Sequence, residues 1–262
     1  MEAKKRLGQN FLTDQSAISS ILNRFNAQSG EPVVEIGPGR GALTAGLLKS
    51  GALLTAVEFD RDMVSILKNR FGTQEHFSII QADILKITLS DCHSAGPVRV
   101  IGNLPYNISS PILFHLLNQI DSVKDMYFML QKEVVERIVA DPGNRDYGRP
   151  SIMLQRSFET TMDVVIEPES FTPPPKVRSA MLRLVPRQQP IGGRIDVKLF
   201  ERVVTQAFSQ RRKTLRNTLK GLATSEQMES VGIDPGQRAE SVDVAGFTRL
   251  VAALESSAMV AG

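Results

Sequence analysis

The stretch VVEIGPGRGALT, residues 33–44, decides the fold class of this chain. An apolar run leads into Glu35, and glycines follow at positions 37, 39 and 41. Glycine lets the backbone turn sharply and approach a ligand more closely than any side chain would allow. A buried strand that ends in such a turn is typical of the first strand of an α/β sheet, whose ligands bind at the carboxyl ends of the strands.

Segments of continuous hydrophobicity recur after this stretch, and helix-like segments alternate with them. Continuous rather than alternating apolar residues favour strands that are buried on both faces, as in a parallel sheet covered by helices. The sequence therefore predicts an α/β fold with a doubly wound, Rossmann-like sheet. The expected strands are 32–37, 52–60, 77–83, 98–103 and 125–131, and the expected helices are 41–50, 61–70 and 109–120.

The composition changes after the proline-rich stretch 173–186 and the glycine pair at 192 and 193. The segments beyond this point have helical periodicity and no strand-like runs. We therefore expect a catalytic domain over residues 1–190 and a small helical domain over 191–262. The expected helices of the second domain are 196–209, 211–221 and 244–255.

Positive charge is concentrated in the C-terminal third. Residues 181–262 hold 12 basic and 8 acidic residues, whereas residues 1–180 hold 19 basic and 20 acidic residues. The stretch RVVTQAFSQRRKTLRNTLK, residues 202–220, has six basic residues and no acidic one. Such a block indicates binding of a polyanion such as a nucleic acid, although a solvated helix face is the plainer interpretation. The candidate phosphate contacts are Arg211, Arg212, Lys213 and Arg216.

The bulk composition excludes several classes of protein. A chain of 262 residues with 42% hydrophobic and 23% charged residues is ordinary for a globular protein with a sizeable core. No apolar run approaches the roughly 18 residues that span a bilayer, and no secretory leader is visible, so we expect a cytoplasmic protein. The single cysteine, Cys92, excludes an internal disulfide, and three histidines provide no zinc-ligand cluster, so no metal is expected.

The carboxylate at the glycine turn indicates the kind of cofactor. A glycine-rich turn can hold a pyrophosphate at a helix N-terminus, but Glu35 enters the turn directly and would repel an anion. A cofactor with a cationic amino group and a sulfonium would instead be attracted. We therefore expect S-adenosylmethionine rather than a dinucleotide.

Acidic residues also follow the next two strands. Glu58 lies 21 residues beyond Gly37, the usual offset for an acid that accepts hydrogen bonds from a ribose diol. Asp83 ends the third strand and is placed to accept a hydrogen bond from the adenine amine. Each could be an ordinary surface carboxylate, but together at one edge of a sheet they favour an adenosyl ligand.

The fourth strand ends in NLPY, residues 103–106, which suits methylation of an adenine amine. This amine is a poor nucleophile because its lone pair is conjugated into the ring. The side-chain oxygen of Asn103 and the backbone carbonyl of Leu104 can hold its hydrogens and direct the lone pair at a methyl group. Pro105 would stiffen the turn, and Tyr106 would stack on a base removed from its helix.

The chain resembles the ribosomal RNA adenine dimethyltransferases over about residues 4–250. The resemblance is carried by RLGQNFLTD, VVEIGPGRGALT, VEFDRDM, GNLPYNISSPILF, MLQKEVVERIVA, YGRPS, FTPPPKVRSAMLRLVP and FSQRRKTLRNTL. These blocks are most similar to the bacterial small-subunit branch. That branch implies dimethylation of two adjacent adenosines in a hairpin loop near the 3′ end of the RNA, within an immature small subunit. It also implies a role in small-subunit biogenesis and a monomeric enzyme.

The resemblance further implies roles for individual residues. Gln9, Asn10 and Leu12 would close over the cofactor, and Gly37, Gly39, Glu58, Asp83 and Asn103 would contact it from the strand ends. Phe171 would be the second aromatic, with the target adenine between it and Tyr106; a buried structural phenylalanine is the alternative.

Two other functions stay open from the sequence. The chain could be an RNA-binding assembly factor that no longer needs methylation, against which the intact Glu58, Asp83 and NLPY set argues. It could also be an enzyme of the resistance type, which methylates large-subunit RNA on the same architecture.

Overall fold

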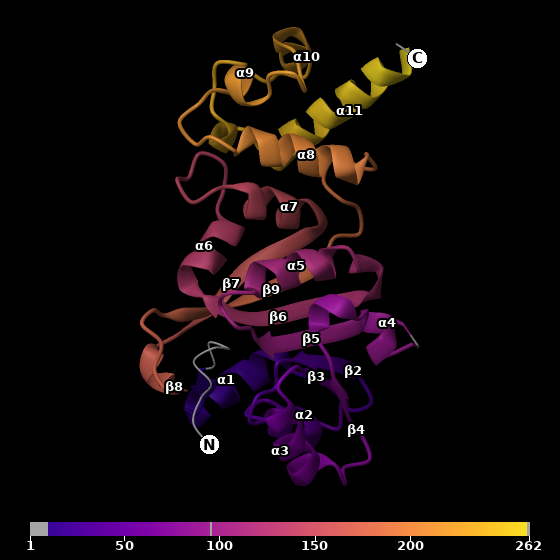
Figure 1. Ribbon diagram of the computed structural model, residues 1–262, viewed down its shortest axis with the longest axis vertical. Coiled ribbons are helices and arrows are strands. Elements are labelled where there is room, and N and C mark those ends of the chain that lie inside the picture. Colours follow the sequence, from indigo (N-terminus) through magenta and orange to yellow (C-terminus); the bar gives the residue numbers. More distant parts are fainter. Residues whose placement is uncertain (1–9, 95, 261–262) are drawn as a thin grey trace. The chain divides into compact units, whose positions relative to one another are not determined.

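The computed structural model describes residues 10–94 and 96–260 (Figure 1). The chain forms two compact units. The first holds the residues up to Val135 together with Thr161–Pro186, and the second holds Glu136–Thr160 together with the residues from Arg187 onward. The C-terminal part of the second unit begins at Arg187, close to the boundary expected at residue 190, but the unit also contains 136–160, which the sequence assigned to the first domain.

A seven-stranded sheet forms the centre of the first unit, in the order β4-β3-β2-β5-β6-β9-β7. The strands from β2 to β6 pair in parallel, and β9 is antiparallel to β6. This arrangement confirms the predicted α/β class with its Rossmann-like sheet. The strands are β2 (Pro32–Ile36), β3 (Leu53–Glu58), β4 (Phe77–Gln81), β5 (Val98–Asn103), β6 (Val123–Gln131), β7 (Phe158–Ile166) and β9 (Ser179–Pro186).

Helices cover both faces of this sheet in the first unit (Figure 1). On one side lie α1 (Gln15–Phe25), α2 (Thr44–Lys49) and α3 (Arg61–Phe71). On the other side lie α4 (Leu89–Cys92) and α5 (Ser109–Leu117). The short 3₁₀ turns are η2 (Ile84–Lys86), η3 (Ile120–Ser122) and η4 (Pro168–Ser170).

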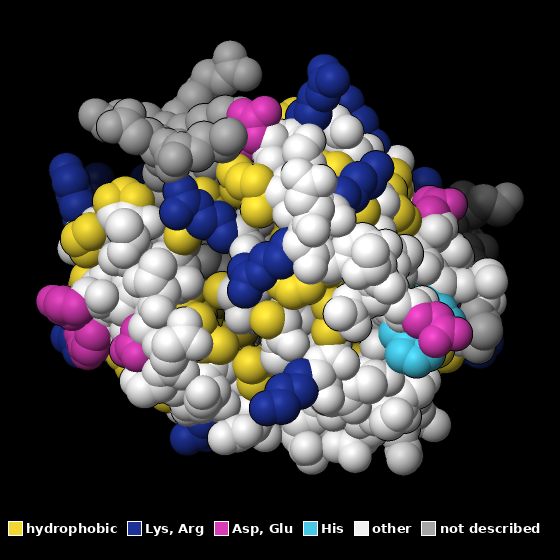
Figure 2. Space-filling view, turned by 90° about the horizontal axis from the view of Figure 1, so that it is seen from below, with side chains coloured by type: hydrophobic (Ala, Val, Ile, Leu, Met, Phe, Trp, Pro, Cys, Tyr) yellow, Lys and Arg dark blue, Asp and Glu magenta, His cyan; other side chains and the backbone are white. Residues whose placement is uncertain are grey.

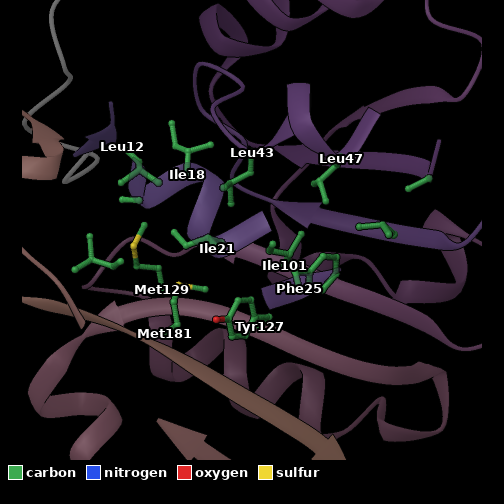
Figure 3. Packing of buried hydrophobic residues seen from close by; sticks show 14 of the residues in the cluster. Leu12, Ile18, Ile21, Phe25, Leu43, Leu47, Ile101, Tyr127, Met129 and Met181 are labelled. Atoms are coloured by element: carbon green, nitrogen blue, oxygen red, sulfur yellow. The ribbon is translucent and has the colours of Figure 1, made fainter. Parts of the chain in front are cut away.

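The helix α1 begins and packs as its sequence dictates. The Asp14 side chain accepts hydrogen bonds from the backbone N–H groups of Ser16 and Ala17 and so caps the helix. The buried residues Ile18, Ile21 and Phe25 recur at helical spacing and face the sheet. Figure 3 shows this apolar core, which α1, α2 and the central strands share; it includes Ile21, Phe25, Leu43, Leu47, Ile101, Tyr127 and Met129.

A second, two-stranded sheet joins the N-terminal segment to the chain before β9. The strand β1 (Phe11–Leu12) pairs antiparallel with β8 (Phe171–Thr172). The backbone N–H of Thr13 donates to the carbonyl of Ser170 at 2.8 Å and extends this contact. Segments about 160 residues apart in sequence are therefore fixed side by side.

The second unit is helical. Its helix α7 packs against α8 and α11, which explains why 136–160 belongs with the C-terminal residues. Its helices are α6 (Lys132–Val139, of which the first four residues belong to the first unit), α7 (Arg149–Ser157), α8 (Val197–Ala207), α9 (Leu215–Thr218), α10 (Ser225–Ser230) and α11 (Val244–Val260), with a 3₁₀ turn η5 (Ala239–Ser241).

The expected helix 211–221 is wrong in its first part. Residues 211–214 are not helical, and α9 begins only at Leu215. Thr214 is extended and forms an isolated β-bridge with Arg238, and the Leu215 N–H donates to the carbonyl of Gln237. These contacts end the turn after α8, so Arg211, Arg212 and Lys213 of the basic block lie in this turn, whereas Arg202 lies on α8 and Arg216 on α9.

Candidate active site

Four consecutive strand ends of the first unit line one cavity of about 310 Å³. Glu35 reaches it from β2, Glu58 from β3, Asp83 from the turn after β4 and Asn103 from β5. The parallel register brings these ends to the same edge of the sheet, because Glu35 lies beside Ala56 and Ile101 on the neighbouring strands. Residues Asn10, Phe11 and Leu12 of the N-terminal segment also line the cavity.

The glycine turn requires glycine at two positions for different reasons. Gly37 has a φ of +66°, and its N–H donates to the carbonyl of Val57, which closes the turn onto β3. Gly39 has a φ of +56°, and a Cβ atom there would lie 3.2 Å from the ring of Phe11. The close approach of β1 to the turn therefore depends on a residue without a side chain.

Glu35 is buried beside the cavity, with only 1% of its surface exposed. Its Oε2 accepts a hydrogen bond of 2.6 Å from the hydroxyl of Thr44, at the start of α2. Burial raises the pKa of Glu35 to about 7, the hydrogen bond from Thr44 opposes this shift, and the nearby Glu58 adds to it. A cation in the cavity would favour the ionised carboxylate, whereas a phosphate would not.

Glu58 supports the glycine turn and faces the cavity at once. Its Oε2 accepts from the N–H of Gly39 at 3.1 Å, and its Oε1 accepts from the N–H of Asp60 at 2.8 Å. Burial raises the pKa of Glu58, and these hydrogen bonds oppose the shift. Each carboxylate oxygen has further lone pairs, so the group can still accept from a ligand hydroxyl.

Asp83, Asn10 and Leu12 also lie at this cavity. The Asp83 side chain accepts from the N–H of Leu85 and so caps the 3₁₀ turn η2 that continues the wall. Leu12 is buried in the core beneath the cavity. Gln9 lies outside the described residues.

The side-chain amide of Asn103 is held in one orientation. Its Nδ2 donates to the backbone carbonyl of Asn10 at 3.1 Å. A carbonyl accepts only from the NH₂ side of the amide, so this contact leaves Oδ1 of Asn103 as the acceptor at the cavity. Leu104 follows with its N–H bonded to the carbonyl of Met129, and both Asn103 and Leu104 line the cavity.

Tyr106 lies at the cavity and is anchored through its hydroxyl. The hydroxyl lies 2.8 Å from that of Ser179, and the two share a hydrogen bond. Burial raises the pKa of the Tyr106 phenol, which stays neutral at physiological pH.

A family model described as ribosomal RNA adenine dimethylase matches residues 1–256. The chain belongs to this family. It is 51% identical over 249 residues to the ribosomal RNA small subunit methyltransferase A of Pseudomonas aeruginosa, covering 95% of this chain and 93% of that one. It is 50% identical over 252 residues to the protein of the same name from Thiobacillus denitrificans, covering 96% and 97%.

Solved structures share the fold of this adenine dimethylase. A dimethyladenosine transferase from Plasmodium falciparum has a TM-score of 0.78 with 24% identity, covering 95% of this chain and 98% of that one. The 23S rRNA methyltransferase ErmE has a TM-score of 0.72 with 25% identity, covering 94% and 100%. The chain is therefore a methyltransferase that acts on ribosomal RNA, and its cofactor is S-adenosylmethionine.

The residues of the cavity fit this cofactor. Glu35, Glu58, Asp60 and Asp83 contribute four carboxyl groups to the cavity wall, on which Arg40 is the one basic side chain among the residues that the structure describes. Such a wall favours a cationic ligand over the pyrophosphate of a dinucleotide. Sequence reasoning missed Phe59, which follows Glu58, lines the same wall and is 63% exposed; a large apolar residue directly after the strand-end acid was the available signal.

Arg40 holds the N-terminal strand of the dimethylase against the glycine turn. Its guanidinium carbon lies 4.6 Å from the centre of the Phe11 ring. Its backbone carbonyl accepts from Arg70 at 3.0 Å. The sequence alone predicts no role for Arg40, because the contact with Phe11 is not visible in the local pattern.

Phe171 is not brought to the cavity, in contrast to its expected place opposite Tyr106. Its side chain is 2% exposed and belongs to the apolar core. It lies on β8, where it pairs with Leu12 of β1. The described cavity lining holds Tyr106 but not Phe171, so in this conformation Phe171 supports the strand beneath the site instead of offering a stacking face.

The second unit of the dimethylase contains a basic cavity of about 280 Å³. The turn after α8 contributes Arg211 and Lys213, while Arg212 and Arg216 are exposed and do not line it. Arg211 donates to the carbonyl of Arg145 and lies 4.0 Å from Glu240. The cavity is lined by Arg137, Arg145, Arg149, Arg211 and Lys213, with Asp146 and Glu240 as the acidic residues.

A buried hydroxyl also borders this basic cavity. Tyr147 is 4% exposed, lines the cavity, and its hydroxyl has no hydrogen-bond partner among the described residues. Burying a hydroxyl without a partner costs about 1–3 kcal/mol.

Proposed function

We propose that this dimethylase transfers methyl groups to the exocyclic amine, N6, of two adjacent adenosines in a hairpin loop near the 3′ end of small-subunit ribosomal RNA. The observation that carries the proposal is the orientation of Asn103. Its Oδ1 is left as an acceptor at the cavity, next to the Leu104 backbone, because its Nδ2 is bonded to Asn10.

The first unit would hold the cofactor through groups at the strand ends. Gly37 and Gly39 permit close approach to the turn, Glu58 would accept from the ribose, and Asp83 would accept from the adenine amine of the cofactor. Asn10 and Leu12, with Gln9 before them, would cover it. Phe59 would add an apolar face for its adenine ring. S-adenosylmethionine, when bound, supplies the electrophilic methyl group.

The chain's own residues would prepare the target amine. Oδ1 of Asn103 and the carbonyl of Leu104 would accept the two N–H groups, which withdraws the lone pair from conjugation and directs it at the methyl group. Tyr106 would stack on the flipped base and hold it within reach. Because positioning and charge complementarity lower the barrier, no strong general base is needed.

RNA affinity would come mainly from phosphate contacts. We assign these contacts to Arg211, Arg212, Lys213 and Arg216 of the second unit. The basic lining of this cavity, to which Arg211 and Lys213 contribute, supports a phosphate site there. Figure 2 views the end of the first unit that carries α2 and α3, where basic side chains lie among apolar ones, which suits a nucleic-acid surface.

The small subunit is favoured over the large one by the relatives. Proteins named for the small subunit are about 50% identical to this chain, whereas the 23S rRNA enzyme ErmE is 25% identical. We further propose that the substrate is an immature small subunit, that the enzyme acts as a cytoplasmic monomer, and that methylation is linked to subunit biogenesis. Among the described residues no helix is long and apolar enough to cross a membrane.

Mapping the modified nucleotides tests the proposal. Isolated small and large subunits from cells that lack the modification are incubated with enzyme and labelled S-adenosylmethionine, and the RNA is analysed by mass spectrometry. We expect two adjacent N6,N6-dimethyladenosines in small-subunit RNA alone. Modification of large-subunit RNA would instead identify the resistance type, and binding without turnover would identify an assembly factor.

A further inference from the structure

The contact between Tyr106 and Ser179 joins the loop at the cavity to a rigid part of the sheet. The two hydroxyl oxygens lie 2.8 Å apart. Ser179 is fully buried and is the first residue of β9, where it pairs with Gln131 of β6. β9 lies between β6 and β7 in the sheet, and its pairing with β6 holds the backbone of Ser179 in place.

The other contacts of Tyr106 leave its ring less constrained. Tyr106 lies in the connection between β5 and α5 and is half-buried. The hydroxyl of Ser109 donates to the backbone carbonyl of Tyr106 at 3.2 Å, which fixes the main chain but not the ring. The phenolic oxygen lies at the far end of the side chain, so a hydrogen bond there restricts both side-chain torsions.

We propose that Ser179 is a positioning residue for adenine methylation, because its hydroxyl holds the Tyr106 ring in place before the target base arrives. The proposal rests on the proposed function, since it concerns the ring on which the flipped adenine would stack. A side chain that is already ordered pays no further conformational entropy when the base binds. Ser179 does not touch the base and acts through Tyr106 alone.

A purely structural role for the same hydrogen bond makes a different prediction. A fully buried hydroxyl needs a partner, so losing either group would lower the free energy of unfolding in both cases. Only the positioning role predicts that the rate of methyl transfer falls in folded protein while RNA affinity stays unchanged. Phosphate contacts dominate that affinity, and neither Tyr106 nor Ser179 is among the proposed phosphate contacts.

The test compares Ser179→Ala, Tyr106→Phe and the double variant in single-turnover transfer to small subunits, well below their melting temperatures. We expect each single variant to lose about threefold to tenfold in rate at saturating RNA. This loss corresponds to the conformational entropy of ordering one side chain, which the variant must pay when the base binds. The RNA concentration at half-saturation should not change. The double variant should match the single variants, because both remove one interaction.

Two further variants sharpen the comparison. Ser179→Thr keeps the hydroxyl and should restore most of the rate. Ser78→Ala is a control for loss of a hydroxyl–hydroxyl contact elsewhere in the sheet, since it removes an exposed hydroxyl that lies 2.9 Å from that of Thr55, away from the cavity lining, and should leave the rate unchanged. Tyr106→Ala, which removes the ring itself, should lose on the order of tenfold to a hundredfold.

The outcomes separate this proposal from the proposed function. If the unaltered enzyme does not methylate small subunits, the proposed function fails. If it does and Ser179→Ala transfers at the same rate, the positioning role is wrong while the function stands. A double variant that loses the product of the two single effects would also overturn the positioning role, because the two groups would then act independently.

Discussion

Asn103 donates its side-chain amide to the backbone carbonyl of Asn10, over a distance of 3.1 Å between Nδ2 and the oxygen. This bond connects the end of β5 to the N-terminal segment, which lies 93 residues earlier in the chain. The residue proposed to hold the target amine is therefore oriented by the segment proposed to cover the cofactor. Under these proposed roles, cofactor binding beneath that segment and the orientation of the Asn103 amide would be linked through this one contact.

Cofactor binding should stabilise the protein selectively. S-adenosylhomocysteine at about 100 times its dissociation constant adds about 2.7 kcal/mol to the free energy of unfolding and should raise the melting temperature by several degrees. NAD should cause no shift, because the cavity carboxylates repel its pyrophosphate. Thermal unfolding with each compound checks this. Glu58→Gln should reduce the shift, whereas Glu75→Gln, an exposed carboxylate away from the cavity, should not.

Glu35 should make stability depend on pH. Burial raises its pKa from 4.5 to about 7, so between these pH values the folded protein holds a proton that the unfolded chain has released. The stability contributed by this proton is fully present below pH 4.5 and is lost as pH rises toward about 7.

Denaturant unfolding at pH 5, 6 and 7.5, conditions chosen to span this window, should therefore show that Glu35→Gln gains stability relative to the unaltered protein as pH rises. A difference between the two proteins that stays constant over this range would contradict the assigned shift. Because Glu58 is present in both proteins, its own raised pKa largely cancels from the comparison.

Phe171→Ala should act first on stability. Replacing a fully buried phenylalanine by alanine costs about 3–5 kcal/mol, and Phe171→Leu should cost less because it keeps most of the apolar volume. Equilibrium unfolding in urea measures both. If Phe171→Ala unfolds like the unaltered protein and yet transfers methyl groups slowly, the ring leaves the core to stack on the adenine, as the family resemblance implies.

Neutralising Arg211, Arg212, Lys213 and Arg216 together should weaken RNA binding and flatten its dependence on salt. Each lost phosphate contact on single-stranded RNA lowers the log–log slope by up to about 0.7. Filter binding across salt concentrations gives the slope, and cofactor affinity should not change. A charge-matched comparison sets Arg212→Gln with Lys213→Gln against Lys198→Gln with Arg202→Gln on α8. If the two pairs lower the salt-dependence slope equally, the turn that carries Arg211, Arg212 and Lys213 is only a solvated surface.

The strand ends could be predicted from the sequence because a parallel sheet brings them to one edge whatever the details of packing. Gly37, Glu58, Asp83 and Asn103 each directly end or follow a continuous apolar run, and local pattern located them all. The cationic preference of the cavity followed from Glu35 alone, since its carboxylate enters the glycine turn.

Contacts between distant segments could not be predicted in this way. The bond between Tyr106 and Ser179 spans 73 residues, and no local periodicity encodes it. Phe171 lies on a strand that pairs with β1, far away in the sequence. The motif that begins at Phe171 therefore suggested a function for this residue but could not show whether its side chain lies in the core or at the cavity. The sequence predicted a helix over 211–221 because the segment has helical periodicity. In the structure Thr214 is extended and bridges to Arg238, so the helix begins only at Leu215.

Asn103→Ala tests the central claim most directly. Single-turnover methyl transfer, RNA binding by filter assay and cofactor binding by thermal shift are measured on the same preparation. We predict that Asn103→Ala abolishes transfer while RNA binding stays near that of the unaltered protein, because Asn103 holds the amine as it reacts whereas phosphate contacts provide most of the RNA affinity. Near-normal transfer by Asn103→Ala would contradict the account of the NLPY turn.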